Sequence, residues 1–252
     1  MRPVYYDLHI HTALSPCADN DMTPNDIVGM ALLNCLNLIA VTDHNSFANV
    51  EAVMKAAAGK DLIVLPGAEI ETSEEVHVLC LFPDLICARG FEEELDPLYS
   101  QIPNRPDIFG EQIVYDEHDR RTGVVGRMLL APVAISFDDL HSMTHKHGGA
   151  FIPAHVDRDS YSVLSNLGFL PPHLSIPAVE VSSAGFERGY VKKNPNRLPR
   201  SRVIISSDAH HLWNIADMNH FLYLPELSPQ AAIACLSNET PGRNTGAFGS
   251  FI

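Results

Sequence analysis

The sequence contains few cysteines and few basic residues, and both shortages limit what the protein can be. Its five cysteines, Cys17, Cys35, Cys80, Cys87 and Cys235, include no C-x-x-C pair. This odd, scattered set argues against a disulfide framework and favours a reducing compartment. Lys and Arg number 17 against 31 Asp and Glu, which gives a net charge of −14. Because so acidic a chain repels a phosphate backbone, we expect no long nucleic acid as a partner.

Long apolar runs are missing as well. The chain has no run of 18 apolar residues, and its N-terminal residues MRPVYYDLH contain no signal core. We therefore expect a cytoplasmic protein with no membrane partner. Apolar residues still make up 46% of the 252 residues, enough for a substantial core. The sequence leaves the oligomeric state open.

The first strong pattern lies in residues 4–11, VYYDLHIH. Apolar and polar residues alternate there with the period of a strand, so His9 and His11 project to the same side. Residues 12–19 lose the alternation and collect Ser, Pro, Cys and Asp, as loops do. Two imidazoles at a strand end can share one cation, although two half-buried strand histidines explain this pair alone equally well.

Strands and helices alternate along the rest of the chain. We expect further strands over residues 37–42, 61–66, 76–82, 150–154, 178–181 and 202–206. Helices are expected over residues 24–35, 50–58, 91–99, 136–147, 160–167 and 229–236. A close antiparallel or sequential pairing is expected for 76–82. About seven strand-helix units in a chain of this length fit an α/β barrel better than an open sheet.

Residues 101–131 interrupt this alternation of strands and helices. Residues 112–115 and 124–130 could pair as a hairpin around the polar run 116–123. We interpret 101–131 as an insertion over the core of a single domain spanning 1–252, and 242–252 as a Gly-rich tail.

Polar residues recur just after the expected strands, at His9 and His11, Asp43 and His44, Glu69, His155, and Asp208 and His210. In α/β barrels the active site forms at the carboxyl ends of the strands. Neutral imidazoles with a few carboxylates suit Zn²⁺, Mn²⁺ or Fe²⁺ better than Mg²⁺ or Ca²⁺. A carboxylate among several histidines commonly bridges two cations.

These residues belong to an ordered set of motifs: DLHIHT at 7–12, TDHN at 42–45, GAEIET at 67–72, PAHVDR at 153–158 and SDAH at 207–210. The set resembles the polymerase-and-histidinol-phosphatase (PHP) superfamily. The resemblance implies a distorted (β/α)₇ TIM-like barrel, up to three metal ions and phosphoester hydrolysis.

The resemblance also implies a ligand set. The first metal would take His9, His11, Glu69 and Asp208. Glu69 would bridge to a second metal held by His77 and His155. A third would take His44, His210 and a residue of the first loop, which offers Cys17 and Asp19. We favour Cys17, because Pro16 fixes the turn just before it. We therefore expect two or three ions of Zn, Mn or Fe.

The remaining candidates have supporting roles. Asp43 is expected to orient a ligand imidazole. Arg158, close to His155, is the first choice for binding a substrate phosphate, with Lys192 and Lys193 next, although solvated loop charges explain the lysines equally well. Seven histidines have no motif support and are expected at the surface or on helices: His118, His141, His145, His147, His173, His211 and His220.

These expectations combine into one leading function and two alternatives. The leading prediction is a metal-dependent phosphoesterase or phosphatase that attacks a small phosphorylated substrate with a hydroxide shared between two metals. Its catalytic residues would be Glu69, Asp208, His210 and Arg158. The alternatives are a nuclease acting on short oligonucleotides or DNA ends, and a non-catalytic metal-binding module that keeps the barrel.

Overall fold

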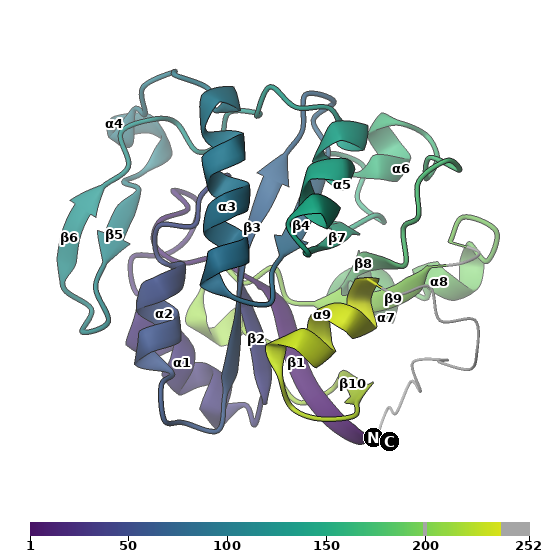
Figure 1. Cartoon of the computed structure of the whole chain (residues 1–252), viewed down its shortest axis with the longest axis horizontal. Coiled ribbons are helices and arrows are strands. Elements are labelled where there is room, and N and C mark those ends of the chain that lie inside the picture. The colour runs from purple at the N-terminus through teal and green to yellow at the C-terminus, as the bar shows by residue number, and fades with distance from the viewer. Residues whose placement is uncertain (199–200, 238–252) are drawn as a thin grey trace.

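The structure, a computed structural model, describes residues 1–198 and 201–237 (Figure 1). The predicted tail at 242–252 lies outside these residues. The main sheet has the strand order β10-β1-β2-β3-β4-β7, and β8 pairs with β9. The strands are β1 (Arg2–Ile10), β2 (Leu38–Val41), β3 (Ile63–Glu71), β4 (His77–Leu81), β7 (Ala150–Pro153), β8 (Ala178–Ser182), β9 (Arg202–Ser206) and β10 (Phe221–Leu224).

The β8–β9 pair lies between β7 and β1 and bends the sheet into a distorted barrel. The Val156 N–H, just past β7, donates to the carbonyl of Glu180 in β8 at 2.8 Å. After β9, the Ala209 N–H donates to the His9 carbonyl at 3.2 Å, and the His11 N–H donates to the Ala209 carbonyl at 3.0 Å. These bonds join the carboxyl ends of β1, β7, β8 and β9, so the expected TIM-like α/β barrel is confirmed.

Two strands of the main sheet, β4 and β10, run antiparallel to their neighbours. β4 is antiparallel to both β3 and β7, and Glu71 at the end of β3 pairs with His77 at the start of β4. The start of an antiparallel strand lies beside the carboxyl end of its neighbour. His77 therefore lies at the same edge as the strand ends, although it opens its own strand.

Apolar side chains form two layers, one inside the curved sheet and one outside it. Val4, Tyr6 and Leu8 of β1 belong to the inner layer, which α9 (Pro229–Ser237) covers through Ala232 and Leu236. Ile10 belongs to the outer layer, and the pairing of β1 with β2 shifts register between Asp7 and Ile10. The simple alternation expected for this strand thus breaks near its end, where the histidines begin.

The outer layer packs beneath the helices α1 (Pro24–Leu33), α2 (Val50–Ala56), α3 (Leu85–Leu95) and α5 (Phe137–Lys146). Thr23 and Ser136 cap α1 and α5, because their side chains accept hydrogen bonds from the N–H groups of Asp26 and Asp139. The helix predicted over 91–99 begins too late, and its last part is a 3₁₀ helix, η1 (Asp96–Leu98), that follows α3 directly. The Asp84 carboxylate accepts the Cys87 N–H at 2.9 Å and starts α3 six residues earlier.

Several short elements were not expected from the sequence. They are α4 (Pro106–Phe109), α7 (Ser183–Glu187), α8 (Tyr190–Lys193), η2 (Leu212–Asn214) and β10. The expected helix over 160–167 is reduced to α6 (Val163–Asn166). Each of these helices has a turn or two at most, too short to show helical periodicity in a sequence.

The expected hairpin is present as β5 (Ile113–Tyr115) and β6 (Arg121–Val124), on one side of the barrel (Figure 1). Its second strand comes earlier than the predicted 124–130, because the Asp116 carboxylate accepts the N–H groups of His118 and Arg120 and closes a tight turn. The region contacts the loop after β1 through Ile113 N–H, which donates to the Ala13 carbonyl at 3.0 Å.

The same region also contacts the loop after β2. Asn45 Nδ2 donates to the carbonyls of Leu129 and Ala131 at 2.8 and 3.1 Å. Residues 101–131 therefore lie against two of the loops that carry predicted ligands. Among the described residues, no helix has the length and apolar character needed to cross a membrane.

Candidate metal centre

The fold brings the predicted ligands together at the carboxyl edge of the barrel. His9 and His11 come from the end of β1, Glu69 from β3 and His77 from the start of β4. The others follow β2, β7 and β9: His44, His155, Asp208 and His210. Most of them are buried, and Asp208 and His210 are half-buried. Water therefore has little access to the polar atoms of these side chains that have no hydrogen-bond partner in the protein.

Hydrogen bonds at the Nδ1 atoms fix the ring orientations of His9 and His11. His9 Nδ1 lies 3.0 and 3.1 Å from the two carboxylate oxygens of Glu180, and an ionised carboxylate can only accept. Ser15 Oγ donates to Asp43 at 2.7 Å, so it accepts the hydrogen on His11 Nδ1, 2.9 Å away. Both Nδ1 atoms thus carry a hydrogen, and both Nε2 atoms face the centre, where each offers a lone pair to a cation once any proton on it has been displaced.

Those two lone pairs converge with two carboxylates. His9 Nε2 and His11 Nε2 are 3.1 Å apart, and each lies 3.2 Å from Asp208 Oδ1. The two oxygens of Glu69 lie 3.4 Å from His9 Nε2 and 3.5 Å from His11 Nε2. Atoms bound at 2.0–2.2 Å to one tetrahedral cation lie about 3.4 Å from each other. The donor set therefore fits a divalent cation of the zinc, manganese or iron type.

A second group shares Glu69. Its Oε1 lies 2.9 Å from His77 Nδ1 and 3.1 Å from His155 Nε2. Its Oε2 is 3.0 Å from His44 Nδ1, yet it accepts no hydrogen bond from the described residues. His155 Nδ1 is likewise buried without a partner there. A buried carboxylate oxygen facing several imidazoles without a hydrogen bond fits a bridge between two cations.

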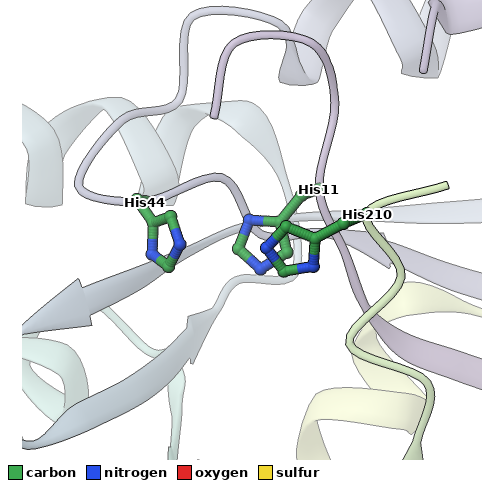
Figure 2. A group of neighbouring side chains, drawn as sticks. All are labelled: His11, His44 and His210. Carbon is green, nitrogen blue, oxygen red and sulfur yellow. The ribbon is translucent and has the colours of Figure 1, made fainter. Parts of the chain in front are cut away.

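A third group consists of His11, His44 and His210. One ring nitrogen from each of these residues lies within 4.8 Å of the other two. Figure 2 shows the rings of His11 and His210 overlapping, with His44 beside them, and the centroids of His11 and His210 are 4.2 Å apart. Burial would raise the pKa of the Cys17 thiol, but interactions with His210 and His44 outweigh it and lower that pKa to about 6. Asp19, the rival ligand, instead lies 3.3 Å from His211. The interaction of the Cys17 thiol with His210 and His44 favours Cys17 over Asp19, and its role as a ligand stays a prediction.

The charges of the site are tightly coupled. Burial would raise the pKa of Glu69, but the positive charges of His77, His9 and His44 hold it well below its usual range. For Asp208, the charge of His9 and the contact with the His11 ring overcome burial and lower the carboxyl pKa. Burial and the nearby imidazoles of His210 and His44 hold the pKa of His11 well below its usual value, so its ring is neutral. Both carboxylates are thus ionised and available to a cation.

Glu180 is a residue that our reading of the sequence missed. It is buried in β8, its Oε2 also accepts the His155 N–H at 3.0 Å, and it therefore positions two predicted ligands. A signal was present, because Glu180 is the one charged residue in the apolar stretch AVEV at 178–181. A lone carboxylate in a buried parallel strand needs a specific partner.

Of the three described residues predicted to bind phosphate, only Arg158 contacts a residue of the cluster. Arg158 Nη2 lies 2.6 Å from Asp208 Oδ2, and 44% of the Arg158 side chain is exposed. Lys192 and Lys193 are exposed at the end of α8. Within the described part of the chain, no hydrogen bond or ion pair joins either lysine to the cluster. Arg158 therefore lies at the centre, and the lysines do not.

An α/β barrel with a buried centre of imidazoles and carboxylates at the carboxyl ends of its strands defines a class: a metal-dependent phosphoesterase, a hydrolase of ester bonds. The chain belongs to the PHP domain family, whose family model matches residues 7–166, well over half of the 252 residues. The resemblance of the ordered motifs is thus confirmed.

Two curated relatives match a shorter segment. The chain is 34% identical over 87 residues to the 5′-3′ exoribonuclease Rnm of Salmonella typhimurium, and 30% identical over 79 residues to a 5′-3′ exoribonuclease of Haemophilus influenzae. The matches cover 32% and 30% of this chain and 29% and 28% of those proteins. The chain therefore aligns with less than a third of the length of either relative.

Solved structures match nearly the whole fold. The lesion-specific endonuclease PfuEndoQ from Pyrococcus furiosus gives a TM-score of 0.67 at 18% identity, covering 94% of this chain and 56% of that one. PsfC from Pseudomonas syringae gives 0.59 at 18% identity, covering 93% and 89%. At such identities these likenesses establish the shared fold.

Proposed function

We propose that the protein hydrolyses the phosphoester bond of a small phosphorylated substrate at this metal centre. The observation that carries the proposal is the convergence of the His9 and His11 lone pairs with the carboxylates of Asp208 and Glu69, at 3.1–3.5 Å. Four donors at this spacing, with Arg158 beside them, suit a phosphate bound to cations.

The ligand assignment follows the three groups. The first ion would be held by His9, His11, Glu69 and Asp208, the second by Glu69, His77 and His155, and the third by His44, His210 and Cys17. When bound, divalent cations lower the pKa of water toward about 7 and offset the charge that develops on the phosphoryl group.

The chain itself supplies orientation, charge and exclusion of water. Glu180 and Ser15 hold the rings of His9 and His11 with their Nε2 atoms toward the centre. Arg158 binds the substrate phosphate, because a guanidinium has five donors and its contact with Asp208 leaves others available. Burial of Glu69 and the imidazoles keeps the site in a medium where charge interactions are stronger than in water.

A second candidate is a nuclease acting on short oligonucleotides or DNA ends. Two relatives are exoribonucleases by name, and PfuEndoQ is an endonuclease by name. The net charge of −14 argues against long nucleic acid and leaves short substrates open.

Glu69→Gln tests the proposal. Protein loaded with Zn²⁺, Mn²⁺ or Fe²⁺ is assayed on phosphomonoesters, phosphodiesters and short oligonucleotides. We expect turnover by wild type, a loss of at least about 100-fold in Glu69→Gln, and unchanged rates in Glu93→Gln, which alters an exposed carboxylate. Turnover of no ester by the loaded wild type, or near wild-type turnover by folded Glu69→Gln, would contradict the proposal.

A further inference from the structure

Two exposed aromatic rings flank the metal centre and take no part in the chemistry proposed above. Tyr161 is 46% exposed, and Trp213, the single tryptophan of the chain, is 73% exposed. One face of each ring packs on a histidine, so the other face is available to a flat ligand. An exposed aromatic face next to a phosphate-binding centre offers a stacking surface to a base.

Tyr161 packs against the second ligand group. Its ring centroid lies 4.8 Å from that of His77 with 32° between the planes, and its carbonyl accepts the His77 N–H at 3.0 Å. Its backbone has φ of 54°, a left-handed conformation that aromatic residues rarely adopt. Such strain is found where a site needs a side chain in one place. Arg158, the proposed phosphate ligand, is three residues earlier in the same loop.

Trp213 lies on the side of the third group. Its ring stacks on His211 at 4.6 Å with only 7° between the planes, and His211 directly follows His210. His211 Nδ1 lies 3.3 Å from Asp19, in the loop that also carries Cys17. The ring is therefore held by a polar partner rather than by a hydrophobic core.

The two aromatics lie at opposite ends of one series of rings. Successive centroid distances are 4.8 Å from Tyr161 to His77, 5.4 Å from His77 to His44, 4.5 Å from His44 to His11, and 4.2 Å from His11 to His210. His210 leads through His211 to Trp213. The series thus connects the ligand groups to an exposed ring at each of its ends.

We propose that Tyr161 and Trp213 are stacking surfaces for the nucleobases of the substrate, which makes the substrate a nucleotide or a short oligonucleotide. The proposal rests on the phosphoesterase function proposed above. Every base has a π-face, so stacking holds a nucleotide without reading its sequence. It also needs no basic groove, and the chain has 17 basic residues against 31 acidic ones.

Binding is tested first, because Trp213 is the only source of tryptophan emission. The protein is titrated with adenosine 5′-monophosphate and with ribose 5-phosphate, which has the same sugar and phosphate but lacks the base. We expect saturable quenching by the nucleotide alone. Equal responses to both ligands, or no response to either, would overturn the role of Trp213.

Kinetics then test both rings. Trp213→Ala and Tyr161→Asn, an amide that tolerates left-handed backbone, should each lower kcat/KM for the nucleotide relative to ribose 5-phosphate by about 5- to 100-fold, mainly through KM. Trp213→Phe and Tyr161→Phe should restore most of the loss. Tyr223→Ala, which removes a ring from β10 at the opposite end of β1, should change neither rate.

Each outcome has a separate meaning. Unchanged substrate ratios in both ring variants would refute the stacking surfaces while leaving the phosphoesterase intact. A change in oligomeric state of Trp213→Ala without a change in nucleotide KM would assign the ring to a subunit contact and also refute the proposal. If wild type hydrolyses neither ester but the nucleotide still quenches emission, the stacking site stands and the proposed reaction falls.

Discussion

Replacement of Glu180 by Gln should weaken metal binding without touching a metal ligand. Glu180 is buried and accepts from both His9 Nδ1, at 3.0 and 3.1 Å, and the His155 N–H, at 3.0 Å. Gln keeps the shape but offers one acceptor oxygen and an NH₂ group. The NH₂ group then replaces one of the two oxygens that face the buried His9 Nδ1–H, and in one amide orientation it also faces the His155 N–H. The His9 ring is therefore held less firmly, or the His155 loop shifts.

The expected magnitude follows from these contacts. Loss of a residue that orients a ligand imidazole typically lowers metal affinity by about 10- to 100-fold, which is about 1.4–2.7 kcal/mol. The unsatisfied buried donor should also lower the free energy of unfolding of the metal-free protein by about 1–3 kcal/mol.

Competition with a chelating dye measures the affinity, and denaturant unfolding of the metal-free protein measures the stability. Glu187→Gln, which alters an exposed carboxylate, is the matched control. Metal affinity in Glu180→Gln equal to that of the control would refute the argument that Glu180 fixes the tautomer and orientation of His9.

Three further outcomes are expected. With a pKa of about 6, the Cys17 thiol is about 90% thiolate at pH 7, so iodoacetamide should modify it rapidly in metal-free protein and slowly after metal loading. Mass spectrometry of the Cys35→Ser protein measures both rates. Equal rates with and without metal would remove Cys17 from the site. Arg158→Ala should raise KM by roughly 10-fold or more on any cleaved substrate, and unchanged KM and kcat would make Arg158 only a surface charge. Neighbouring carboxylates overcome the effect of burial and raise the pKa values of His9 and His44, so these rings hold protons that a cation must displace. Metal affinity should therefore fall as the pH falls from 8 to 6, and metal binding should release protons. A metal affinity that does not depend on pH would contradict this.

The barrel and the gathering of polar residues at one edge of it could be predicted because they depend on local patterns. Buried parallel strands are short apolar runs, and the polar residues that follow them mark one edge of the sheet. The placement of His77 could not be predicted this way, because it depends on β4 running antiparallel to β3. Only the three-dimensional register puts the start of β4 beside the end of β3.

Other features depend on contacts distant in sequence. β10 is held by pairing with β1, more than 200 residues away, so its four residues carry little signal of their own. Glu180 reads as part of a core strand until His9 is placed against it. The first six residues of α3 show only weak helical periodicity in the sequence. The start of this helix depends on one hydrogen bond, from the Cys87 N–H to the Asp84 carboxylate.

The most direct test of the centre is metal stoichiometry in wild type and Glu69→Gln. Both proteins are reconstituted with Zn²⁺ or Mn²⁺, passed over a desalting column and analysed for metal per chain. Because Glu69 presents its two oxygens to separate imidazole groups, wild type should retain at least two ions per chain and Glu69→Gln one or none. A single ion in wild type, or the same content in both folded proteins, would contradict a centre bridged by Glu69.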